Sequence, residues 1–290
     1  MNLSVLMLLF VTLVWGTTFP IIRAAAEHLS GVEISALRFL IAGLCMLPLT
    51  VTASRKAWRD GAILGSIALL SYVTQAVGLE YISSNRSAFI TSLNVLMVPF
   101  LGLLLGRRLN LQIIAAGVVA CAGIGLMSWE SGSSLIGDGA TFACAFFYAV
   151  YVIMLSRRIG AHRTRTLAAT QNVTMAVIGG VWLLVADFMH GGALASLPAR
   201  AESVWLSLLY LGLVASAGML FLQAAGQRHV SAEKAAVIYA MEPVFAAVFG
   251  WWWLGEAMGM RGLIGGAMVV GAVILGEWRF KARRPVSKQV

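Results

Sequence analysis

The sequence predicts an all-α integral membrane protein in which ten transmembrane helices form two inverted five-helix repeats around a central cavity. Three observations predict this fold. Only 11% of the 290 residues are charged and 60% are hydrophobic, which argues against a soluble enzyme, a disordered chain or a nucleic-acid binder. Apolar runs of about 20 residues, each long enough to cross a bilayer, recur along the whole chain. The two halves of the sequence also resemble each other.

The apolar runs define the expected spans. They cover residues 3–23, 32–53, 61–80, 84–106, 110–129, 137–157, 167–189, 204–226, 232–254 and 260–279. The first run ends near three alanines that imitate a signal-peptide cleavage site. No Lys or Arg precedes this run and it contains Pro20, so we expect it to persist as the first helix. Ten spans use about 200 residues, which leaves connections too short for an extramembrane domain.

Basic residues predict the orientation. If the N-terminus is cytoplasmic, sixteen Lys and Arg fall on the inner side and four on the outer side. The inner set is Arg55, Lys56, Arg59, Arg107, Arg108, Arg157, Arg158, Arg163, Arg165, Arg228, Lys234, Arg279, Lys281, Arg283, Arg284 and Lys288. The outer set is Arg23, Arg86, Arg200 and Arg261. Because positively charged connections stay inside, we expect both termini in the cytoplasm.

An internal repeat predicts two halves. Residues 87–106, SAFITSLNVLMVPFLGLLLG, match residues 231–250, SAEKAAVIYAMEPVFAAVFG, at a constant offset of 144. We therefore expect a first repeat over residues 1–131 and a second over 132–290, which ends in a short basic cytoplasmic tail. Five helices is an odd number, so the second half enters the membrane upside down. This is typical of secondary transporters that bind substrate near the midplane, although a channel or a membrane enzyme can also arise by duplication.

Three segments carry a resemblance to a known family. They are LVWGTTFPIIRAA at residues 13–25, LRFLIAGL at 37–44 and MEPVFAAVFGWWWLGE at 241–256. With these segments the chain resembles the drug/metabolite transporter superfamily, EamA type. The resemblance implies a ten-helix carrier of a bacterial inner membrane that exports amino acids or other small metabolites. The family's Leu-Gly-Glu is kept at residues 254–256 but reads Leu-Gly-Arg at 105–107, so that glutamate is not expected to be essential in both halves.

Candidate binding residues share one depth in the membrane. Trp15, Tyr72, Asn94, Tyr148 and Glu242 each lie about 15–18 Å from the start of their spans at 1.5 Å per residue, close to the midplane. They come from the first, third, fourth, sixth and ninth spans. Convergence of five spans at one depth is what a central cavity predicts.

Helical spacing extends this set. The fourth span has a polar stripe of Ser84, Ser87, Thr91 and Asn94, and the sixth has Thr141, Cys144, Tyr148 and Tyr151. The expected substrate-binding residues are Trp15, Tyr72, Gln75, Asn94, Tyr148, Tyr151, Tyr239 and Glu242. Hydrogen bonding between helices is the structural alternative for them. Aromatic walls with few fixed charges suit small zwitterions and do not suit phosphorylated substrates.

Arg38, Pro99 and Pro243 are the candidate gate or hinge residues. Arg38 lies within the second span, where snorkelling or pairing with Glu33 or Glu27 could hold its charge; an outer gate or a partner for a substrate carboxylate is the functional alternative. The two prolines occupy equivalent positions in the repeats, as hinges or as static kinks.

We expect a secondary transporter that exports small metabolites by alternating access, with amino acids as the first substrate class and broad specificity. Glu242 could bind a substrate ammonium, couple transport to a proton or serve only as a structural acid. Alternatives are a drug or other metabolite efflux carrier, a channel and a membrane enzyme. We expect no cofactor, metal or nucleic acid as partners, only the lipid bilayer and a small-molecule substrate, and a monomer with a homodimer as the alternative.

Overall fold

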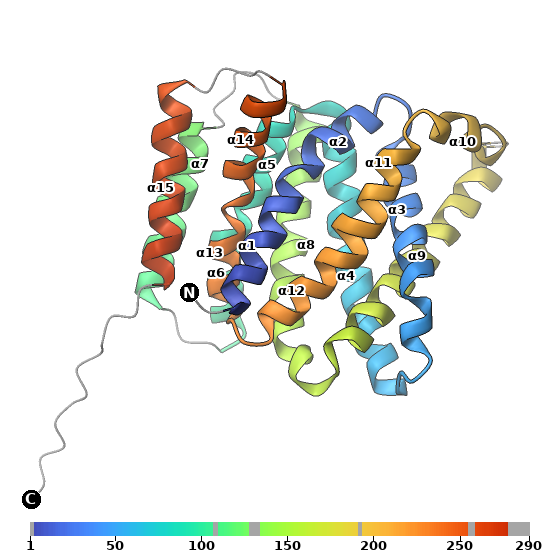
Figure 1. Ribbon diagram of the computed structural model, residues 1–290, viewed down its shortest axis with the longest axis horizontal. Coiled ribbons are helices and arrows are strands. Elements are labelled where there is room, and N and C mark those ends of the chain that lie inside the picture. The colour runs from blue at the N-terminus through green and yellow to red at the C-terminus, as the bar shows by residue number, and fades with distance from the viewer. Residues whose placement is uncertain (1–2, 107–109, 128–133, 191–192, 255–258, 278–290) are drawn as a thin grey trace, which may run out of the picture.

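The computed structural model describes residues 3–106, 110–127, 134–190, 193–254 and 259–277. Throughout these ranges the chain forms helices connected by short turns, with no strand (Figure 1). Seven helical segments in this part are long and apolar enough to cross a membrane. The molecule is therefore an all-α membrane protein, as the sequence predicts.

Each of the ten expected spans corresponds to helix in the described ranges. In order they are α1 (Leu3–Gly16) with α2 (Thr18–Ala25); α3 (Gly31–Met46) with η1 (Leu47–Thr50); α4 (Arg55–Tyr81); α5 (Ser84–Ser92) with α6 (Asn94–Leu104); α7 (Leu111–Met127); α8 (Leu135–Arg158) with η2 (Ile159–Ala161); α9 (Thr164–His190); α11 (Trp205–Leu209), η3 (Tyr210–Gly218) and α12 (Met219–Gln227); α13 (Ala232–Tyr239) with α14 (Glu242–Leu254); and α15 (Met260–Glu277). A further helix, α10 (Ala193–Glu202), lies between α9 and α11.

Prolines account for two of the breaks within spans. A proline has no N–H and its ring collides with the carbonyl four residues earlier. Gly16, where α1 ends, lies four residues before Pro20, and Tyr239, where α13 ends, lies four residues before Pro243. Pro99 lies inside α6, which begins after a break at Leu93. These interruptions place irregular backbone in the interior of the bundle.

Helix packing follows a symmetrical pattern. In two inverted halves, each span is equivalent to the span five places away in the chain. The contact between α4 and α8, the third and sixth spans, then corresponds to the contact between α12 and α1, the eighth and first. The contact between α6 and α8, the fourth and sixth spans, corresponds in the same way to the contact between α14 and α1, the ninth and first. In the contacting pairs α3–α9 and α7–α15, the two helices of each pair are the equivalent spans of the two halves. In Figure 1, α7 and α15 lie at one edge of the bundle and α9 and α10 at the other. This is the contact pattern that two related five-helix halves predict.

The outer surface of the bundle is apolar. Large side chains such as Leu104 and Phe188 are 81% and 88% exposed. Such exposure is unfavourable in water and suits contact with lipid tails.

Ion pairs and one histidine contact join the helix ends. They link Arg86 to Asp138 and Arg200 to Glu33, each at 2.6 Å. Asp60 pairs with Arg158 at 3.3 Å and contacts His162 at 2.8 Å. The hydrogen bonds that Arg200 donates to the Glu33 carboxylate raise the pKa of Arg200, so this pair keeps its charges at physiological pH. The start of α1 and the end of α15 both lie at the lower end (Figure 1).

Candidate substrate-binding site

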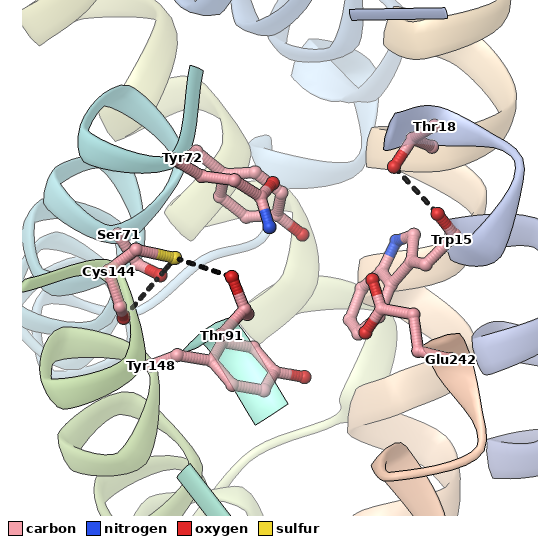
Figure 2. Close-up of a pocket in the computed structure, with 9 residues that line it drawn as sticks. Trp15, Thr18, Ser71, Tyr72, Thr91, Cys144, Tyr148 and Glu242 are labelled. Carbon is pink, nitrogen blue, oxygen red and sulfur yellow. Dashed lines mark hydrogen bonds between the residues drawn. The ribbon is translucent and has the colours of Figure 1, made fainter. Parts of the chain in front are cut away.

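A small pocket lies in the interior of the bundle. It is lined by Trp15, Thr18, Ser71, Tyr72, Gln75, Thr91, Cys144, Tyr148 and Glu242. Figure 2 shows Tyr72, Thr91 and Tyr148 facing Trp15 and Glu242 across this space. The lining comes from the first, third, fourth, sixth and ninth spans, which are the five spans whose polar and aromatic residues share the midplane in the sequence.

Aromatic rings line the pocket on both sides, and hydrogen bonds from neighbouring helices orient them. The Trp15 ring lies 6.0 Å from the Tyr148 ring in an edge-on arrangement. The Trp15 indole N–H donates to the backbone carbonyl of Ala215 at 2.9 Å, and Gln223 Nε2 donates to the Tyr148 hydroxyl at 2.9 Å. Both partners belong to the eighth span, which thereby holds the wall in place. Rings fixed in this way lose little entropy when a ligand binds.

Three of the expected residues lie behind the pocket rather than on it. Asn94 Nδ2 donates to the Thr91 carbonyl at 2.8 Å, at the break between α5 and α6. The Tyr239 hydroxyl donates to Gln227 Oε1 at 3.1 Å, and the Tyr151 hydroxyl accepts from Gln171 Nε2 at 3.2 Å. The Tyr239 ring still packs against the wall, 5.7 Å from the Tyr148 ring. In this conformation these side chains support the pocket from a second layer.

Small polar side chains complete the lining. The Ser71 hydroxyl donates to the Cys144 carbonyl at 3.1 Å, and the Thr18 hydroxyl donates to the Trp15 carbonyl at 2.7 Å. Ser71 and Thr18 are absent from the set predicted from the sequence. Ser71 could have been found, because it lies four residues before Gln75 on the same face of α4. Thr18 offered no such signal, since its position depends on the break after α1.

Glu242 is the carboxyl group of the pocket. It is the first residue of α14, and Figure 2 shows its carboxyl group directed towards the pocket interior. Within the described residues no ion pair neutralises it. The start of a helix favours a negative group, because the first backbone N–H groups point towards it. The pocket therefore offers an acidic group that a bound cation could approach.

Arg38 differs from the expectation. The predicted pairing with Glu33 is wrong, because Glu33 pairs with Arg200. Snorkelling is also wrong, since Arg38 is only 2% exposed. Its Nε donates to the Ser216 hydroxyl at 2.9 Å, and its guanidinium carbon lies 4.8 Å from the centre of the Tyr72 ring. The eighth span and the pocket wall therefore hold this cation inside the bundle.

The eighth span contains an element that the sequence did not predict. Its middle part, η3, is a π-helix. The Ser216 hydroxyl donates to the Leu211 carbonyl at 2.7 Å, and the Ala215 carbonyl accepts from Trp15. Such wider turns are rare and occur frequently at functional sites. Here the π-helix supplies hydrogen-bonding partners for both Trp15 and Arg38.

The fold and the pocket define an all-α membrane protein with a small pocket of aromatic and polar side chains in its interior. The chain belongs to the EamA-like transporter family, whose model matches residues 2–129 and 135–276. The family and the names of the relatives indicate a transporter rather than an enzyme.

Relatives of full length carry different names. An uncharacterized transporter of Archaeoglobus fulgidus is 30% identical over 92% of this chain and 83% of its own. A probable terminal-alkyne amino-acid exporter of Streptantibioticus cattleyicolor is 27% identical over 96% of this chain and 94% of its own. A probable biotin transporter of Pseudomonas aeruginosa is 27% identical over 92% and 95%. A crystal structure with 18% identity superposes with a TM-score of 0.76 over 95% of this chain and 96% of that one, which shows the same fold.

Proposed function

We propose that this protein is a secondary carrier that exports small metabolites bearing an ammonium group, with amino acids as the first substrate class and broad specificity. The observation that best supports this proposal is Glu242, a carboxyl group that faces an aromatic-walled pocket without a cation beside it. A substrate ammonium would supply the missing positive charge. The amino-acid exporter among the relatives agrees with this substrate class.

The remaining lining supports the same ligand. Tyr72, Tyr148 and Trp15 offer ring faces that attract a cation and pack against an apolar side chain. No Lys or Arg is among the lining residues, which disfavours a phosphorylated substrate. The hydroxyl groups of Thr18, Ser71 and Thr91 in the lining can bond a range of polar groups, as broad specificity requires.

We further propose alternating access between two inverted halves, residues 1–131 and 132–290, in a monomer of a bacterial inner membrane with both termini in the cytoplasm. The symmetrical helix contacts support the two halves. The positions of the first and last described helix ends at one side of the bundle, together with the basic residues of the sequence, support the orientation. Pro99 and Pro243 remain candidate hinges in this scheme, since they lie beside the broken helices of the pocket.

The test is counterflow of radiolabelled leucine in proteoliposomes, with and without a pH gradient. We expect saturable leucine exchange by the wild type and a loss of about 10-fold or more in Glu242→Gln, because a hydrogen bond to a charged group contributes about 1.5–3 kcal/mol. Glu202→Gln, an exposed acid of α10, is the matched control and should behave like the wild type. Unchanged exchange in Glu242→Gln would remove this residue from the substrate site.

The same experiment separates the alternatives. If Glu242 also exchanges a proton, Glu242→Gln abolishes the stimulation of leucine flux by the pH gradient. Flux that does not saturate would indicate a channel, and chemical conversion of leucine would indicate an enzyme.

A further inference from the structure

We propose that Arg38 forms a second subsite, which binds the carboxylate of a zwitterionic substrate whose ammonium lies at Glu242. This inference rests on the proposed function and narrows its substrate class from ammonium compounds to zwitterions. It assigns a binding role to a residue that does not line the pocket in this conformation.

The first observation is a buried charge without a counter-ion. Arg38 is 2% exposed, and its Nη2 has no hydrogen-bond partner in the part of the chain that the structure describes. No carboxylate among those residues forms an ion pair with it. A guanidinium inside a membrane protein costs several kcal/mol unless an anion compensates it. The described residues supply no such anion, so we expect an anion from outside the protein as the partner.

The second observation is the position of Tyr72. Its ring lines the pocket, and the guanidinium carbon of Arg38 lies 4.8 Å from the centre of that ring. Tyr72 therefore contacts the cation and also lines the pocket that Glu242 lines. A change in its side-chain rotamer would connect the guanidinium to the pocket without movement of a helix.

The hydrogen bonds of Arg38 define what it can still bind. Its Nε donates to Ser216, whose own hydroxyl hydrogen is directed to the Leu211 carbonyl. This hydrogen bond uses only Nε. The two Nη groups form the opposite edge of the guanidinium, which can still bind a ligand. Two N–H groups on one edge match the two oxygens of a carboxylate. A phosphate would require further cations, and the pocket lining contains none. The geometry therefore favours a carboxylate.

The experiment compares three probes with one carbon skeleton: leucine, isoamylamine, which lacks the carboxylate, and 4-methylpentanoate, which lacks the ammonium. In counterflow with the wild-type protein we expect leucine to exceed each of the others by about 10-fold, as loss of a charge-assisted hydrogen bond predicts. In Arg38→Gln, leucine exchange should fall about 10-fold to the level of isoamylamine, while isoamylamine exchange stays within about 2-fold of wild type. Arg38→Lys should restore part of the preference, because it keeps the charge and loses the forked geometry.

Arg261→Gln, an exposed arginine at the start of α15, is the control. If Arg38→Gln does not fold, the comparison of the three probes with the wild-type protein still tests the subsite. Equal exchange of leucine and isoamylamine by the wild type would overturn the subsite and leave the proposed function standing. Equal losses of both compounds in a folded Arg38→Gln protein also overturn the subsite. Absence of exchange for all three probes overturns the proposed function and this inference with it.

Discussion

At the scale of residues, the pocket depends on side chains that the eighth span holds in place. Tyr148 forms part of the wall, and its hydroxyl accepts a hydrogen bond from Gln223, whose Oε1 is buried without a partner. Loss of the Tyr148 hydroxyl would leave the amide of Gln223 unsatisfied at both ends. We therefore expect the ring and the hydroxyl of Tyr148 to contribute separately: the ring to the proposed ligand site, and the hydroxyl to the packing of two helices.

Substitutions at Tyr148 should separate these two contributions. Tyr148→Phe keeps the ring and loses one hydrogen bond of about 1 kcal/mol, so we expect a thermal midpoint lower by about 2–4 °C and leucine counterflow reduced about 3-fold or less. Tyr148→Ala removes the wall and should reduce counterflow at least about 10-fold. Phe142→Ala, on the exposed side of the same helix, is the control for counterflow. Equal counterflow in Tyr148→Phe and Tyr148→Ala would contradict a role for the ring.

At the scale of elements, pairs of helices far apart in the sequence approach closely at glycines. Gly123 of α7 faces α15, where a Cβ at this position would lie 2.6 Å from the Gly265 carbonyl oxygen. A methyl group there must push two backbones apart. The α7–α15 pair at the edge of the bundle therefore requires glycine at this crossing.

Gly123→Ala should accordingly destabilise the protein by about 1–3 kcal/mol, the usual cost of overpacking. Gly139 of α8 is the matched control, because nothing lies within 4 Å of its Cβ position. Gly139→Ala should leave the stability unchanged or raise it by about 0.5–1 kcal/mol, as alanine favours a helix. Thermal unfolding of the three proteins in detergent measures both effects. Equal midpoints for the two variants would contradict the close approach.

At the scale of the whole molecule, alternating access requires the two ends of the bundle to face different compartments. The lower end in Figure 1 holds the starts of α1 and α9 and the end of α15, and the upper end holds α10. Basic residues of the sequence favour the lower end as the cytoplasmic one. Figure 1 gives the arrangement of the helices, and the orientation in a membrane remains a prediction.

Cysteine labelling in intact cells tests this orientation. In a background without Cys45, Cys121 and Cys144, a cysteine at Gly160, which is exposed in η2, should react with an impermeant maleimide only after the cells are opened. A cysteine at Glu202, exposed at the end of α10, should react in intact cells. Ser133, a natural choice on the outer side from the sequence, lies outside the described residues. Labelling of both positions from outside would reject the model of the orientation.

What the sequence by itself determined was which segments form apolar helices and which five of them line the pocket. Hydrophobicity is a local property and depth follows from counting residues, so the spans and the five helices around the pocket could be predicted. Span ends were less accurate where a helix begins with polar residues: α4 starts at Arg55, and its apolar run begins at residue 61.

The tertiary structure decided which way each side chain points and what it meets there. Asn94 and Tyr148 share a depth, but only Tyr148 lines the pocket. Snorkelling or pairing with Glu33 or Glu27 was the structural expectation for Arg38, which instead bonds Ser216 from the eighth span. The π-helix that presents Ser216 also had no signal in the sequence. These contacts join residues far apart in the chain. The sequence of one helix could not predict them, because the rotation of each helix is set by how its side chains pack against neighbouring helices.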